Sequence, residues 1–162
     1  MKTIRLSAIL VLGIVSAVGA AQKTRWVAYK SNLLNLQVSV PSDWKPAKIP
    51  NALAFRYDDL AGGTGGIGFL KSSQVHNITE AADSEFQKEG HPEDWTRNDA
   101  RVGGMRAIKI AGTDAKSPDR RFVHYYVETP NGIYIVQCQG TADRWSTLSP
   151  IFATILSKLT FF

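Results

Sequence analysis

Apolar and polar side chains alternate with a period of two along much of this 162-residue chain. Leu36, Val38 and Val40 alternate with Gln37 and Ser39, which is typical of a strand with one buried face. Similar alternation, or a short apolar run, predicts five more strands, at residues 53–57, 67–70, 105–111, 122–128 and 133–139. The pattern therefore predicts that strands dominate the fold.

Two segments have a helical pattern instead. Residues 79–89 place Ala82 and Phe86 four positions apart, and Thr79 is a suitable N-terminal cap. The tail at residues 143–159 gathers its isoleucines and leucines on one side. Pro150 is compatible with a helix that begins at Ser149, or with a break between two shorter helices. We expect one helix in each segment, with the start of the second left open.

The strands at 122–128 and 133–139 form the clearest hairpin, because Asn131-Gly132 between them supplies the positive φ angles of a tight turn. Both faces of this hairpin are apolar. A sheet with two apolar faces needs a cover on each. We therefore predict an α+β fold, an α/β/α sandwich with a mainly antiparallel central sheet and helices on both faces.

The first residues have the composition of an export signal. Lys2 and Arg5 precede an uncharged stretch at residues 6–21, and Val18 and Ala20 fit the small-x-small cleavage rule. An uncleaved membrane anchor is the alternative, but sixteen uncharged residues fall short of the ~20 that span a bilayer. We expect a signal peptide at 1–20 and one domain at 21–162. The mature protein would be exported, periplasmic or secreted, with no stable membrane anchor.

Charge and composition exclude several classes of function. The net charge is +5, but the longest basic run is only Arg120-Arg121, so nothing indicates a nucleic-acid surface. Residues 80–99 carry seven acidic and two basic side chains. A solvated helix face followed by a loop explains this block, and a cation-binding or partner-binding site is the alternative.

Catalytic signatures are absent from the sequence. The single cysteine, Cys138, alternates inward on its strand and is expected to be an inert core residue. The three histidines are too far apart in sequence to indicate a zinc site, and no serine stands in a nucleophile elbow. The glycines at 63–68 fit G-x-G-x-x-G only as a string, because a strand-like segment follows them. We expect a flexible hairpin loop there, no enzyme and no cofactor.

The tryptophans divide into core and candidate surface residues. Trp44 follows a strand-ending proline and is expected to close the end of the sheet, and Trp145 is expected to pack the last helix. Trp95 stands in a charged loop without an evident core face. Because exposed tryptophans are favoured at binding hot spots, Trp95 with Glu93 and Asp94 is the candidate interaction site.

Several segments resemble one family. The segment at 35–44, with its strand followed by Pro41 and Trp44, the segment at 55–60, and the hairpin and closing helix at 126–161 look like PsbP-like domains. Gly103-Gly104-Met105-Arg106-Ala107 resembles the exported DcrB-like relatives. The resemblance implies an α/β/α sandwich, a fold shared with a Ran-binding nuclear import factor. It implies no enzyme activity, and it carries no binding residue over to this chain.

Two classes of function follow from these observations. The leading one is an exported, non-catalytic PsbP/DcrB-like module that binds or stabilises an envelope protein or complex. The other is a small-molecule or calcium-type metal-binding protein that uses the acidic segment at 80–99.

Overall fold

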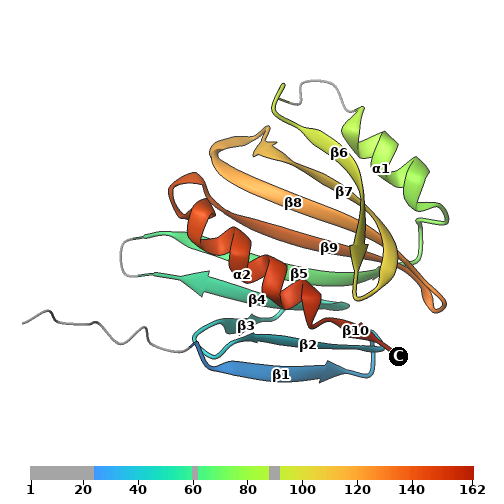
Figure 1. Ribbon diagram of the computed structural model, residues 1–162, viewed down its shortest axis with the longest axis horizontal. Helices are drawn as coiled ribbons and strands as arrows, with labels where there is room; N and C mark the ends of the chain where they lie inside the picture. Colours follow the sequence, from blue (N-terminus) through green and yellow to red (C-terminus); the bar gives the residue numbers. More distant parts are fainter. Residues whose placement is uncertain (1–23, 60–61, 88–91) are drawn as a thin grey trace, which may run out of the picture.

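The computed structural model describes residues 24–59, 62–87 and 92–162, and its strands form two antiparallel sheets (Figure 1). The large sheet has the strand order β3-β4-β5-β9-β8-β7-β6, and the small sheet has the order β1-β2-β10. The strands of the large sheet are β3 (Lys45–Ala47), β4 (Ala52–Asp58), β5 (Thr64–Ser72), β6 (Thr96–Val102), β7 (Met105–Asp114), β8 (Ser117–Thr129) and β9 (Gly132–Thr141). Those of the small sheet are β1 (Trp26–Ser31), β2 (Leu36–Pro41) and β10 (Thr160–Phe161).

Two α-helices accompany the sheets in the described part of the chain. Helix α1 (Ile78–Phe86) begins after Asn77, whose side chain accepts hydrogen bonds from the backbone N–H groups of Thr79 and Glu80. The cap is therefore Asn77 and not Thr79 as predicted, because an asparagine carbonyl oxygen satisfies the same orphan donors. Helix α2 (Trp145–Ser157) follows a 3-10 turn at Ala142–Arg144.

Helix α2 settles the question that Pro150 left open. The helix begins at Trp145 and runs through Pro150 to Ser157, so neither a start at Ser149 nor a break occurs. Proline lacks a backbone N–H and removes one intrahelical hydrogen bond. Burial compensates for that loss, because Leu148, Phe152, Ile155 and Leu156 are all buried.

Alternation along β8 divides the core into two clusters, one on each face of the large sheet. Val127 on one face belongs to a cluster with buried residues of β2 and α2, including Val38, Leu148 and Phe152. Phe122 and Tyr126 on the other face belong to a cluster with the buried residues of α1. Helix α2 thus shares its side of the large sheet with the small sheet.

The prediction of an α+β fold with a mainly antiparallel sheet is confirmed. The predicted α/β/α sandwich with helices on both faces does not describe the whole arrangement. One covering layer is mixed, because β1, β2 and β10 pack beside α2 over the core (Figure 1).

The glycine-rich segment determines where α2 lies. Gly65, Gly66 and Gly68 belong to strand β5 and not to a flexible loop, which corrects the sequence prediction for them. Gly65 pairs with Gly140 on β9, and a Cβ at either glycine would lie 2.5–2.7 Å from a methyl carbon of Leu148. Two glycines side by side therefore leave room for α2 to approach the sheet closely.

The β8–β9 hairpin forms as predicted, but its turn differs by one position. Thr129 pairs with Gly132, so Pro130 and Asn131 are the two turn residues. Only Gly132 has a positive φ, of 118°, whereas Asn131 does not. Proline fixes φ near −65° at the first turn position, which excludes the type I′ and II′ hairpin turns that need a positive φ there.

Candidate functional site

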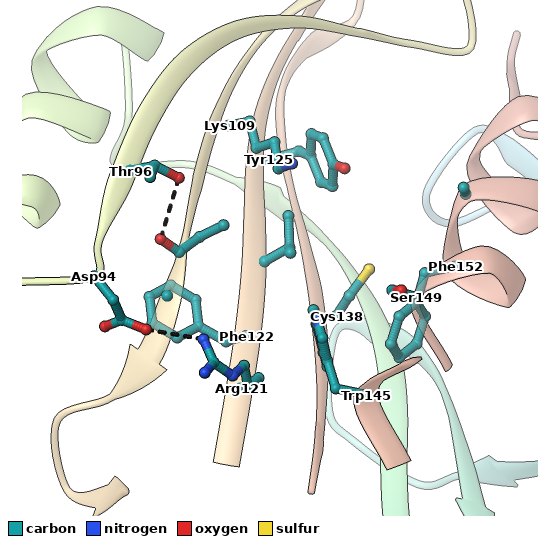
Figure 2. A pocket seen from close by; sticks show the side chains of 14 residues that line it. Asp94, Thr96, Lys109, Arg121, Phe122, Tyr125, Cys138, Trp145, Ser149 and Phe152 are labelled. Carbon is teal, nitrogen blue, oxygen red and sulfur yellow. Dashed lines mark hydrogen bonds and ion pairs between the residues drawn. The ribbon is translucent and has the colours of Figure 1, made fainter. Parts of the chain in front are cut away.

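A groove of about 420 Å³ lies between α2 and the neighbouring strands of the large sheet (Figure 2). Helix α2 packs on β2 and β9 and leaves the same face of β7 and β8 open beside it. Val123 of β8 is half-buried at this face, and Phe152 and Trp145 of α2 form the opposite wall. The groove is thus apolar at its base.

Polar side chains line the same groove. Lys109 of β7 and Tyr125 of β8 lie side by side across the two strands, in direct register, and Ser149 lies on the α2 side (Figure 2). Burial, with a smaller contribution from the nearby Cys138, raises the pKa of Tyr125 to about 12. The phenol therefore stays neutral at physiological pH and retains a hydrogen to donate.

A second cavity of about 520 Å³ continues the groove toward the end of α2. It shares Tyr125 and Ala153 with the first cavity and reaches Leu156, Leu159 and Arg101. The two cavities thus adjoin along one side of α2. We call them together the α2 groove.

At the end of the groove away from the second cavity, Asp94 connects its own loop to strands β7 and β8. Its carboxylate accepts hydrogen bonds from the Thr113 hydroxyl at 2.6 Å and the Thr113 backbone N–H at 3.3 Å, and pairs with Arg121 at 2.9 Å. The Thr113 side-chain hydrogen bond, with the Thr113 backbone N–H and Arg121, lowers the pKa of Asp94 against the opposing effect of burial. Asp94 therefore fixes its loop against strands β7 and β8 through Thr113 and Arg121.

We expect the Asp94 carboxyl to titrate below its ordinary value of 3.8 in the folded protein. Carbon-detected NMR of the aspartate carboxyls against pH measures the midpoint. A carboxyl whose pKa is lower in the folded than in the unfolded state stabilises the fold at pH values above its unfolded-state pKa. This contribution should be lost as the pH falls through the pKa of Asp94 in the folded state. Thr113→Val should raise the midpoint more than Arg121→Gln does, and the reverse order would contradict the assignment of the main cause.

Trp95 has a core face, contrary to the sequence interpretation. Its ring packs edge-to-face on Phe122 at 4.9 Å between centroids, and its indole N–H donates to the Thr113 carbonyl at 2.7 Å. A Cβ at Gly112 would lie 2.4 Å from the indole, so the glycine makes room for it. The ring is half-buried and packs against the cluster that α1 covers.

Trp95→Ala is therefore expected to lower the free energy of unfolding by about 2 kcal/mol, roughly half the cost of truncating a fully buried tryptophan. Urea unfolding followed by circular dichroism measures this difference. Trp95→Phe keeps the contact with Phe122 but loses the hydrogen bond to Thr113. Its free energy of unfolding should therefore lie between those of the parent chain and Trp95→Ala. A change below about 0.5 kcal/mol would show that the indole is a surface group.

The other acidic residues of the 80–99 segment divide between paired and exposed positions. Glu85 accepts from the Tyr126 hydroxyl and contacts His124 Nδ1, both at 2.8 Å, and Asp83 pairs with Arg97. Glu93 is exposed. No group of three histidines, cysteines or carboxylates that could hold a metal ion occurs among residues 24–59, 62–87 and 92–162. Glu89 and His91 lie outside those ranges.

Cys138 is fully buried, as predicted, and burial raises the pKa of its thiol above the usual value. A protonated, inaccessible thiol is a poor nucleophile. Trp44 is buried as expected, at 3% exposure. Trp145 lies on α2, and its ring is 5.8 Å from that of Phe152.

The structure brings Asp94 to the groove, but the groove's central residues were missed by sequence reasoning. Lys109 and Tyr125 stand on predicted strands, where each was counted only as part of the alternation. One signal was available, because Lys109 lies between Ala107 and Ala111 on one face while Ile108 and Ile110 occupy the other. A lysine among small residues, opposite a fully apolar face, indicates a sheet surface that is not completely covered.

No family model matches this sequence, and no curated protein matches it. Solved structures do match. Cyanobacterial PsbP (CyanoP) from Synechocystis sp. PCC 6803 matches with a TM-score of 0.56 and 14% identity, over 93% of this chain and 100% of that chain. The chain has the PsbP-like fold.

Two further structures share this fold. LpqN of Mycobacterium tuberculosis, described as involved in cell envelope biogenesis, matches with a TM-score of 0.52 and 15% identity, over 85% of this chain and 91% of its own. The Ran-binding protein Mog1p of Saccharomyces cerevisiae matches with a TM-score of 0.52 and 10% identity, over 85% of this chain and 96% of its own. The predicted resemblance to the PsbP-like fold, including its occurrence in a Ran-binding protein, is confirmed. At these identities the likeness concerns the fold alone.

The helices in the described ranges are too short or too polar to cross a membrane.

Proposed function

We propose that this chain is an exported, non-catalytic module that binds a protein of the cell envelope through the α2 groove. The observation that carries the proposal is the half-covered face of the large sheet. Val123, Ala153 and the aromatic ring of Tyr125 present apolar surface, line the groove and remain partly exposed. Exposed apolar side chains framed by charged residues are typical of protein-binding surfaces.

The neighbours in structure support the class of function. LpqN is described as involved in cell envelope biogenesis, and Mog1p as Ran-binding. A fold alone does not determine function. The proposal therefore rests on the groove, and the roles named for LpqN and Mog1p are consistent with it.

A small-molecule or calcium-type site in the 80–99 segment has weaker support. The carboxylates of Asp83, Glu85 and Asp94 are each engaged by side chains of this chain. A metal would have to displace these partners. The interaction role proposed for Trp95 and Glu93 stays a prediction, and their neighbour Asp94 reaches the groove.

Export is the second part of the proposal. Cleavage after Ala20 would leave the described fold intact, because the first strand begins only at Trp26. The intact mass of the protein from the envelope or culture medium should correspond to a chain that begins near Ala21. A protein that retains Met1 in the cytoplasm would contradict export.

Capture from a solubilised envelope fraction on the immobilised mature chain tests the binding surface. We expect the parent chain to retain a protein that Val123→Arg does not retain, because the new side chain fills and charges the groove. Gln137→Arg is the matched control, since Gln137 lies on the opposite face of the sheet. Equal retention by the parent and Val123→Arg would contradict the proposal.

A further inference from the structure

The α2 groove is rich in hydrogen-bond donors that have no partner in the described part of the chain. The Lys109 ammonium and the hydroxyls of Tyr125 and Ser149 all line it, and none pairs with a described side chain (Figure 2). An ammonium carries three donors and no acceptor. Donors in a partly apolar site gain most from an acceptor supplied by a ligand.

The charges of the groove also favour a negatively charged ligand. Its charged lining residues are three cations and one carboxylate, namely Arg101, Lys109, Arg121 and Asp94. Asp94 is already neutralised by Arg121 and hydrogen-bonded by Thr113. Lys109 therefore stands near the middle of the groove as an uncompensated positive charge, and Arg101, which donates to the Gly104 carbonyl at 3.1 Å, adds another at the far end.

The shape favours a segment of protein over a small molecule. Small-molecule sites are concave and bury most of their ligand. Here two adjoining cavities follow α2, which at 13 residues is about 20 Å long. On their floor, Val123 and Tyr125 remain partly exposed. A groove of that form accepts an extended or helical segment that contacts it on one side.

We propose that the α2 groove binds an acidic amphipathic segment of the partner protein. Carboxylates of that segment face Lys109 and Arg101, and its apolar side chains contact Val123, Tyr125 and Ala153. This inference rests on the proposed function, since it states which part of the partner the groove recognises. Charge complementarity of this kind selects partners and accelerates association.

Photocrosslinking from the groove tests the chemistry of the occupant. A benzophenone amino acid replaces Ala153 in the full chain, because Ala153 is exposed on α2 and lines both cavities. The cells are irradiated, and the crosslinked peptide is sequenced by mass spectrometry. The expected product is a protein segment with net negative charge and regularly spaced apolar residues. Lys109→Glu should lower the crosslinking yield about tenfold or more, and Lys109→Gln less, because reversal adds repulsion to the lost attraction.

Lys45→Glu is the matched control, because β3 forms the opposite edge of the large sheet from β6. It should leave the yield unchanged, and circular dichroism melts should be the same for all variants. A neutral or basic segment, a lipid adduct, or a yield insensitive to Lys109→Glu would overturn the inference while leaving a binding role in place. Absence of any adduct at position 153 would overturn the proposed function itself.

Discussion

Trp44→Ala is expected to lower the free energy of unfolding by about 3–5 kcal/mol, the cost of truncating a buried tryptophan. The indole is 3% exposed and contacts Phe152 edge-to-face, at 5.7 Å between ring centroids. It also lies 6.1 Å from the ring of Tyr57. Trp44 thus joins β4 to α2 at the point where β2 ends. Chemical unfolding followed by far-ultraviolet circular dichroism, which reports the backbone rather than tryptophan emission, measures the difference in free energy of unfolding.

Trp44→Phe is the conservative comparison, because it keeps an aromatic ring against Phe152 and should lose about half as much stability. Such losses are large against the 5–15 kcal/mol of a typical domain, so the alanine variant should also accumulate poorly. A loss below about 1 kcal/mol for Trp44→Ala would show that the ring does not close this end of the core.

Leu148→Ala is expected to cost about 2–5 kcal/mol, the range measured for leucines truncated in a rigid core. Leu148 is fully buried, and its methyl group lies over Gly65 and Gly140 of the large sheet. The space left behind cannot close easily, because both glycines belong to paired strands. The same unfolding measurement detects the change.

Leu33→Ala is the matched control, because Leu33 is 74% exposed and its loss should change stability by less than about 0.5 kcal/mol. If Leu148→Ala behaved like Leu33→Ala, α2 would not depend on its contact with the glycine pair. The position of the α2 groove would then have another cause.

Strands buried on both faces were predictable from sequence. In β8 and β9, adjacent positions point to opposite apolar environments, so a continuous apolar run with a turn in between allowed only a hairpin. Strand β6 was missed for the opposite reason. Its sequence, TRNDARV, is mostly polar because it is the edge of the sheet, and only Ala100 and Val102 near its end reach the core. Backbone pairing with β7 holds the rest of the strand.

The site was less predictable than the fold, because it depends on where α2 lies. That position follows from Gly65 and Gly140, which are far apart in sequence and become neighbours only through the β5–β9 register. Read along the chain, Gly65 looked like part of a loop, and Lys109 looked like one polar residue in an alternating strand. Trp95 was misplaced because the space at Gly112 that receives it is visible only once β7 is folded.

Lysine reactivity in the unmodified protein tests the central claim most directly. Acetic anhydride labelling of the mature chain, with and without the solubilised envelope fraction, compares Lys109 in the α2 groove with Lys45 on β3. Because an occupant of the groove would cover its ammonium, Lys109 should lose most of its reactivity in the presence of the fraction, while Lys45 should keep its own. Unchanged labelling of Lys109 under conditions in which the protein is bound would show that the partner lies elsewhere.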